Sequence, residues 1–236
     1  RVFHYSGKGY ECVMVMNESI SETIQESATL PHMLSPSQPD IRLLEYDAFE
    51  NCLYETECRN RTFFLLLEPG ESRIFLAVPR GANLPAAVCR PHPSSRKELT
   101  GDICLSISRV PHYDRFRFIG KRRKLTDLSM EEGFSDFHGV IRYEMDFVSG
   151  EEEEITGKEM IWLDGANEVV TLRINDSKEQ IRIGTPYRFS VGAHLRKGVN
   201  HLIVDNITTV FPYKKDHSSI NAPLHPMGIC GHIGLE

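Results

Sequence analysis

The stretch "MEEGFSDFHGVIRYEMDF", residues 130–147, changes character halfway along its length. Its first half is an acidic loop, and its second half alternates apolar and polar side chains strictly from Ile141 to Phe147. Because successive side chains of an extended chain point to opposite faces, this alternation predicts a half-buried strand. Gly133 and Gly139 bracket the end of the loop, where a backbone without Cβ can turn sharply. The stretch therefore predicts a loop that enters a sheet.

Short apolar runs separated by turn residues recur along the whole chain. They include "YECVMVM" (10–16), "FFLLL" (63–67), "RIFLAV" (73–78), "DICLSISRV" (102–110), "MIWL" (160–163), "EVVTLRIN" (168–175), "QIRIG" (180–184), "YRFSV" (187–191) and "NHLIVDNI" (200–207). No long helix is indicated, and strands do not alternate with helices. The pattern predicts an all-β fold and excludes a (β/α)₈ barrel, which alone takes about 250 residues.

Composition shifts in the segment "PRGANLPAAVCRPHPSSRKE", residues 79–98, which holds four prolines and little hydrophobic periodicity. Such a composition is typical of a linker or an interdomain crossing. We therefore predict two β-sandwich domains, a small one over 1–80 and a larger one over 96–236. Residues 81–95 connect them.

The charge of the chain argues against nucleic-acid and membrane partners. The net charge is −6 and the pI is near 6.0, so no overall basic field is present. No stretch approaches the roughly 20 apolar residues that span a bilayer. The basic run "KRRK" (121–124) has no interleaved aromatic residues and is interpreted as a surface loop.

Cysteine and histidine spacing gives no sign of a metal or cofactor site. None of the six cysteines forms a C-x-x-C pair. Cys12 and Cys104 lie in apolar strand patterns, which favours buried free thiols and, weakly, a cytoplasmic location. His217, His225 and His232 match no metal-binding spacing, so neither metal nor cofactor is expected.

Taken in order, "FSDFHGVIRYEMDF", "EMIWLDGANEVVTLRINDSKEQIRIGTPYRFSV" and "LRKGVNHLIVDN" resemble the sugar-binding jelly-roll domain of glycoside hydrolase family 2 and its relatives. The resemblance covers roughly residues 99–236, and the upstream part looks like the small β-sandwich that often precedes such a jelly roll. Turn and strand-entry positions of that family are matched by Gly139, Gly165, Asn175, Pro186, Tyr187, Gly198 and Asn200. Asp176 stands where the family usually has glycine, and Leu172 where it often has tryptophan.

The resemblance implies a galactose-binding-like jelly roll in a non-catalytic, carbohydrate-contacting accessory portion of a bacterial-type glycoside hydrolase. The catalytic carboxylate pair of such enzymes sits on a barrel, and this chain contains no barrel. Its partners would be an oligosaccharide or polysaccharide and the catalytic domain of a longer parent chain. The alternative is a purely structural module that buttresses that catalytic domain.

Five residues are candidates for carbohydrate contact, through an aromatic face or through polar groups that bond hydroxyls. They are Tyr187, Arg188, Asn206, His217 and His225. For Tyr187 and Arg188 a packing role in the sheet remains the alternative. Trp162, which follows Ile161 in a core-like strand pattern, is interpreted as a packing residue. Pro223 and Pro226, with the glycines that follow them near the end of the chain, predict a mobile rim loop over 211–226 that contains or borders any glycan or interdomain contact.

Overall fold

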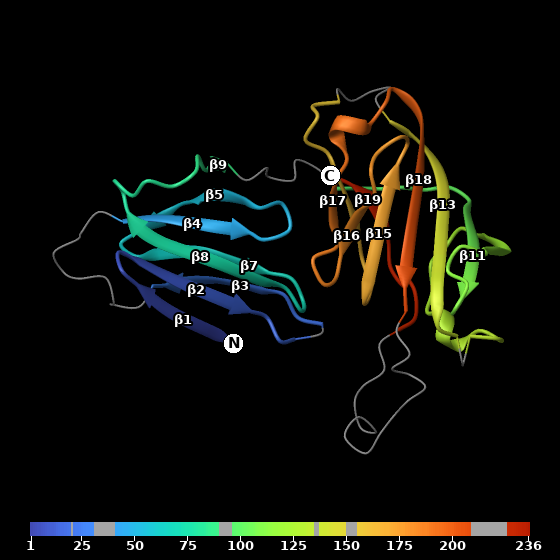
Figure 1. Cartoon of the computed structure of the whole chain (residues 1–236), viewed down its shortest axis with the longest axis horizontal. Coiled ribbons are helices and arrows are strands. Elements are labelled where there is room, and N and C mark those ends of the chain that lie inside the picture. Colours follow the sequence, from blue (N-terminus) through green and yellow to red (C-terminus); the bar gives the residue numbers. More distant parts are fainter. Residues whose placement is uncertain (20, 31–40, 90–95, 135–136, 150–154, 209–225) are drawn as a thin grey trace, which may run out of the picture. The chain divides into compact units, whose positions relative to one another are not determined.

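The computed structural model describes residues 1–19, 21–30, 41–89, 96–134, 137–149, 155–208 and 226–236. Almost all regular structure in these segments is β-strand, with two short 3₁₀ helices, η1 (Leu128–Met130) and η2 (Gly192–His194) (Figure 1). The all-β fold class is therefore confirmed. The chain divides into two compact units, unit 1 (Arg1–His92) and unit 2 (Pro93–Glu236).

Unit 1 is built from a six-stranded and a three-stranded sheet, with strand orders β1-β2-β8-β4-β5-β9 and β3-β7-β6. Its strands are β1 (Val2–Gly7), β2 (Tyr10–Met16), β3 (Ile24–Thr29), β4 (Ile41–Asp47), β5 (Cys52–Thr56), β6 (Cys58–Arg59), β7 (Thr62–Leu67), β8 (Ser72–Pro79) and β9 (Val88–Cys89). Neighbouring strands are antiparallel except for the parallel pair β5 and β9.

The core of unit 1 lies between its two sheets. Alternate residues of β2, β8 and β7 are buried against one another, and the rings of Phe63 and Phe75 meet at a centroid distance of 4.8 Å. β7 and β8 are joined by the short connection "EPGES" yet belong to different sheets. This arrangement makes unit 1 a β-sandwich.

Unit 2 contains a second pair of sheets, with orders β12-β11-β13-β18-β15-β16 and β10-β19-β14-β17. Its strands are β10 (Lys97–Glu98), β11 (Ile103–Arg109), β12 (Arg117–Arg122), β13 (Gly139–Ser149), β14 (Met160–Leu163), β15 (Val169–Ile174), β16 (Gln180–Arg182), β17 (Arg188–Ser190), β18 (Gly198–Ile207) and β19 (Ile233–Leu235). These strands pair with their neighbours in antiparallel fashion.

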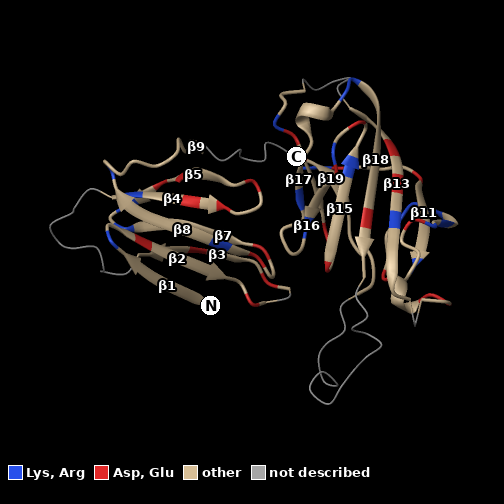
Figure 2. Cartoon of the chain, in the orientation of Figure 1, with Lys and Arg blue, Asp and Glu red and all other residues tan. Residues whose placement is uncertain are grey.

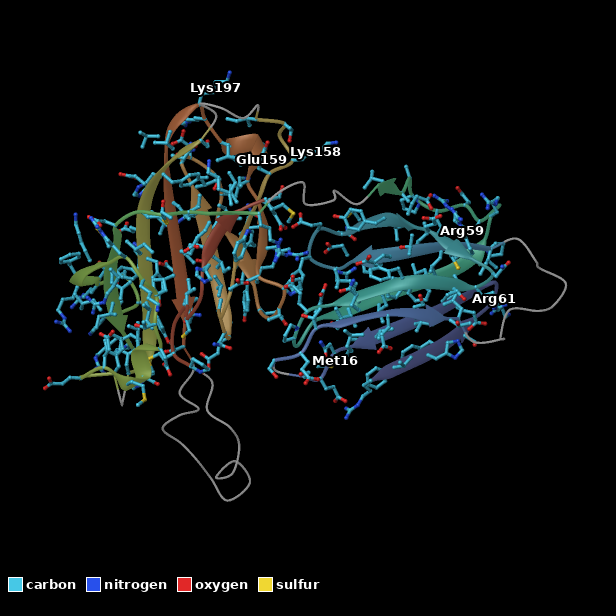
Figure 3. The ribbon with its side chains drawn as sticks, turned by 180° about the vertical axis from the view of Figure 1, so that it is seen from behind. Met16, Arg59, Arg61, Lys158, Glu159 and Lys197 are labelled. Atoms are coloured by element: carbon cyan, nitrogen blue, oxygen red, sulfur yellow. The ribbon has the colours of Figure 1, made fainter. Side chains whose placement is uncertain are left out.

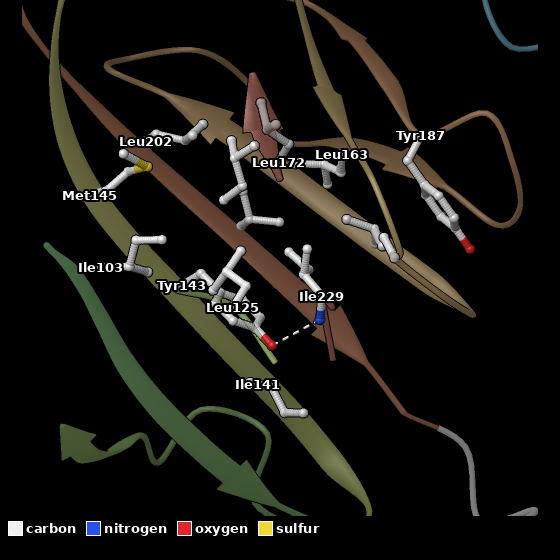
Figure 4. Close-up of a cluster of buried hydrophobic side chains, with 14 of the residues drawn as sticks. Ile103, Leu125, Ile141, Tyr143, Met145, Leu163, Leu172, Tyr187, Leu202 and Ile229 are labelled. Carbon is white, nitrogen blue, oxygen red and sulfur yellow. Dashed lines mark hydrogen bonds between the residues drawn. The ribbon is translucent and has the colours of Figure 1, made fainter. Parts of the chain in front are cut away.

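The half-buried strand predicted from the alternation over 141–147 is present as β13, whose apolar residues face the second sheet. Figure 4 shows Ile141, Tyr143 and Met145 in a cluster with side chains from both sheets. The Tyr143 hydroxyl accepts a hydrogen bond of 3.0 Å from the backbone N–H of Ile229. At the start of the strand, a Cβ on Gly139 would lie 2.0 Å from the Ser108 carbonyl oxygen, so glycine is required there.

Two local expectations need correction. Lys121 and Arg122 of the "KRRK" run belong to the edge strand β12, where Arg122 pairs with Glu131 at 3.0 Å, instead of to a loop. Cys12 and Cys104 are free thiols as expected, but they are only half-buried. Each occupies the alternate position to core residues of its strand and therefore points to the outer face of its sheet.

Lys158, Glu159 and Lys197 lie at one rim of unit 2 (Figure 3). Side-chain hydrogen bonds hold this rim in place. The Glu159 carboxylate accepts bonds from Thr156 and from the Gly157 N–H, the latter at 3.0 Å. Asn200 is fully buried at the same rim and bonds to the turns on either side of it. The rim is thus fixed by a few polar side chains.

Candidate functional site

Tyr187 lies in the core of unit 2, immediately before β17. Its side chain is 4% exposed, within the buried cluster of Figure 4, and its hydroxyl donates a hydrogen bond of 2.7 Å to the carbonyl oxygen of Glu168. Burial raises the pKa of this hydroxyl well above its ordinary value, so it stays protonated. This geometry favours the packing interpretation of Tyr187.

Arg188 follows Tyr187 and points to the opposite, outer face of the four-stranded sheet, beside Trp162 in register. Its Nε lies 3.5 Å from a carboxylate oxygen of Glu236. The Trp162 ring lies against Gly234, where a Cβ would come within 2.3 Å of it, and the Arg96 guanidinium sits 5.3 Å from its centroid. Trp162 thus has the packing role that was expected of it, on the outer face.

Asn206 lies near the end of β18 and is 1% exposed. Its amide donates to the carbonyl oxygen of Asn167 at 2.6 Å and to that of Val169 at 3.4 Å. These bonds tie β18 to the entry of β15. The side-chain donors of Asn206 are therefore engaged within the fold.

The structure places Tyr187, Arg188 and Asn206 in three separate settings and does not gather them into one site. His217 and His225 lie outside the described residues, as does most of the rim loop predicted over 211–226. A carbohydrate-binding role for these five residues stays a prediction.

We expect Tyr187→Phe to lower the free energy of unfolding by about 1 kcal/mol, because it removes one buried hydrogen bond and keeps the ring. Any carbohydrate binding by the chain should be unchanged. The check is urea unfolding together with glycan titration of the same protein. A loss of binding without a loss of stability would restore Tyr187 as a contact residue.

A second arrangement of polar groups lies on the outer face of the six-stranded sheet of unit 2. One row of paired residues crosses all six strands, and we call it the outer polar row. In strand order it consists of Phe118, Ser106, Arg142, Asp205, Thr171 and Ile181. Basic and acidic positions lie close together on its central strands, β13 and β18 (Figure 2).

Arg142 and Asp205 form the centre of the outer polar row. The guanidinium donates from Nε to one carboxylate oxygen and from a terminal nitrogen to the other, both at 2.7 Å. Side-chain exposure is 20% for Arg142 and 10% for Asp205. Such a bidentate pair is geometrically specific and strong. It uses two of the five guanidinium donors, and no other hydrogen bond from Arg142 is found within the described residues.

Aromatic and acidic side chains surround this pair. The Phe116 ring lies over Arg142, with 3.8 Å between the guanidinium carbon and the ring centroid. The hydrogen bond with Asp205 raises the pKa of Arg142, and the charges of Glu144 and Glu179 add to the shift, although burial opposes it. Glu179 itself accepts a bond of 3.1 Å from the Thr171 hydroxyl. The pair is therefore held rigidly.

The outer polar row was not predicted from the sequence. The alternation over 141–147 places Arg142 on the outer face, which is the one available signal, but its partner is 63 residues away. At the edge of the sheet, Phe118 on β12 leaves 59% of its surface exposed. The row thus combines an exposed aromatic ring with unused polar donors, the two features that carbohydrate recognition requires.

The described residues contain no group of three or more His, Cys, Asp or Glu side chains that could hold a metal ion. Among them, no helix is long and apolar enough to span a bilayer.

No family model matches the chain, and no curated protein matches its sequence. Several solved structures are similar in fold. A rhamnosidase from Novosphingobium sp. PP1Y matches with a TM-score of 0.63 over 99% of this chain, at 16% identity. The match covers 23% of that rhamnosidase, so the chain spans less than a quarter of its length.

A β-glucuronidase from Bifidobacterium dentium covers 61% of this chain and 30% of its own length, with 15% identity and a TM-score of 0.41. An isomalto-dextranase from Arthrobacter globiformis T6 covers 97% of this chain and 34% of its own, with 13% identity and a TM-score of 0.22. TM-scores of 0.41 and 0.22 are too low to support a conclusion about the fold of this chain. The likeness to the rhamnosidase shows that both units have the fold of a portion of that protein.

Proposed function

We propose that the chain is a non-catalytic, carbohydrate-contacting accessory portion of a bacterial-type glycoside hydrolase. In this proposal unit 2 is a galactose-binding-like jelly roll, and the catalytic domain lies elsewhere in the parent protein. The fold likeness to part of a rhamnosidase supports this, as does the sequence resemblance over 99–236. The likeness extends over both units, which fits an accessory region that contains both.

The observation that carries the proposal is the Arg142–Asp205 pair beneath Phe116. Sugar hydroxyls act both as donors and as acceptors, so they need both kinds of partner in fixed positions. Arg142 supplies unused donors, and the Asp205 and Glu144 carboxylates supply acceptor lone pairs on the same face. Because Asp205 and Phe116 already fix the guanidinium, little side-chain entropy is lost when a ligand binds. We therefore place the carbohydrate contact on the outer polar row.

A purely structural module remains the second candidate. The burial of Tyr187 and Asn206 favours it, because their polar groups are engaged inside unit 2. In that case the outer polar row would stabilise the sheet without a ligand. The two candidates differ in one measurable property, which is saturable glycan binding.

We expect Phe118→Ala to weaken glycan binding about 3- to 10-fold, the contribution of one aromatic stacking contact. The free energy of unfolding of the Phe118→Ala variant should barely change, because the Phe118 ring is mostly exposed. Phe64→Ala is the matched control, since Phe64 on β7 of unit 1 is also 59% exposed. The measurement is calorimetric titration of the full chain with a panel of oligosaccharides. No binding across the panel would favour the structural module. Saturable binding that both variants change equally would contradict the placement of the contact on the outer polar row.

A further inference from the structure

The charges of the outer polar row point to the class of sugar that it would take. We infer that this face recognises neutral polyhydroxylated glycans and discriminates against acidic ones such as uronates. The inference rests on the proposed carbohydrate function and adds to it a specificity that has a structural cause.

The first step concerns Arg142, the half-buried cation at the centre of the row. An acidic glycan would need this guanidinium as its counterion, yet its charge is already balanced by Asp205, which accepts from Nε and from one terminal nitrogen. A glycan carboxylate bound to the remaining donors would therefore bring a second anion close to Asp205, whose side chain is only 10% exposed and so is little screened by solvent. Displacing Asp205 instead would leave its largely buried carboxylate without a cation, which is strongly unfavourable.

The second step concerns the charges around the pair. Glu144 and Glu179 act on the same guanidinium, and both would repel an incoming carboxylate or sulfate. Two more cations lie on this face by register, Arg173 beside Ile203 and Lys121 beside Cys104. Together with Arg142 these are three cations. The same face carries the carboxylates of Asp205, Glu144, Glu179 and Asp146, so it has no excess positive charge for an anionic ligand.

The third step concerns the polar groups that remain available to a ligand. The unused guanidinium donors of Arg142 and the free lone pairs of Asp205 and Glu144 lie on neighbouring positions of β13 and β18. Two adjacent hydroxyls of a neutral sugar can accept from the guanidinium and donate to a carboxylate. Neither bond requires the existing ion pair to open. A neutral diol therefore fits the face without the electrostatic cost that an acid would incur.

The test titrates the full chain with neutral oligosaccharides, such as cellotetraose and rhamnose-containing oligosaccharides, and with tetragalacturonate. We expect saturable binding of a neutral ligand, at least about 10-fold tighter than tetragalacturonate, and nearly independent of salt between about 0.05 and 0.5 M. Glu144→Gln should raise the affinity for tetragalacturonate several-fold. Glu26→Gln is the control, because it makes the same charge change at an exposed residue of β3 in unit 1.

The outcomes separate the two proposals. Binding of tetragalacturonate as tight as, or tighter than, that of neutral ligands, with affinity falling as salt rises, would overturn the specificity and leave carbohydrate contact standing. Equal effects of Glu144→Gln and Glu26→Gln on the affinity for tetragalacturonate would likewise overturn the specificity and leave carbohydrate contact standing. No measurable binding of any ligand tested would overturn the proposed function, and the specificity with it.

Discussion

Replacing Asn200 by alanine is expected to lower the free energy of unfolding of unit 2 by about 3 to 5 kcal/mol. The Asn200 amide nitrogen donates to the Ser149 hydroxyl at 3.0 Å and to the carbonyls of Arg196 at 2.8 Å and Gly198 at 3.0 Å. Its carbonyl oxygen accepts from the Arg196 N–H and the Asn175 amide, both at 2.8 Å. The side chain is fully buried, so alanine would leave several polar groups unsatisfied at about 1 to 3 kcal/mol each.

Urea unfolding followed by tryptophan fluorescence measures this loss directly. Trp162 is the sole tryptophan of the chain and lies in unit 2, so its signal reports that unit. Asn83→Ala, at an exposed position of unit 1, is the control and should change the midpoint little. A cost below about 1 kcal/mol for Asn200→Ala would show that water replaces the buried amide.

Asn200→Asp adds a pH signature to the same experiment. The carboxylate keeps the acceptor oxygen but cannot donate to the three oxygens that the amide nitrogen now faces. Burial against acceptors raises the pKa of the introduced carboxyl group in the folded state above its unfolded value of about 3.9. The folded state then binds more protons, so stability should fall as pH rises from about 4 to 7. Asn200→Ala should lack this dependence.

The strands that the sequence predicted well are those with a strict apolar alternation or a compact apolar run. β2, β13 and β14 lie at or within two residues of the predicted ranges, because burial of one face fixes both strand and orientation. Two of the strands that it missed are at sheet edges. β1 and β12 pair on one side only, and their side chains are mostly exposed, so no apolar period marks them.

The candidate site was harder to predict for a different reason. An aromatic residue beside an arginine suggests sugar contact, but Tyr187 is buried in the core just before β17, whereas Arg188 pairs with Trp162 on the outer face. Arg142 and Asp205 meet only through the register of β13 and β18, which no local pattern specifies. The Phe116 ring reaches Arg142 from a loop. Long-range register and loop placement are tertiary properties, and a single sequence does not reveal them.

Arg142→Ala is expected to cost about 3 kcal/mol, although the Arg142 side chain is partly exposed. The reason is that Asp205 would keep its charge on a side chain that is 10% exposed, with no cation bonded to it. Removing both charges together should cost much less. We expect Arg142→Met/Asp205→Leu to lie within about 1 kcal/mol of the wild type, because apolar side chains of similar size often replace a buried ion pair without loss.

The double-mutant cycle, measured by urea unfolding, gives the coupling between the two side chains. Arg122 supplies the reference, because its ion pair with Glu131 is 34% exposed on each side and Arg122→Ala should cost no more than about 1 kcal/mol. Equal costs for Arg142→Ala and Arg122→Ala would contradict a sheltered pair. The stable double variant then isolates the function. If the pair is kept for glycan contact, this variant folds and binds no sugar, whereas a purely structural pair predicts that binding persists.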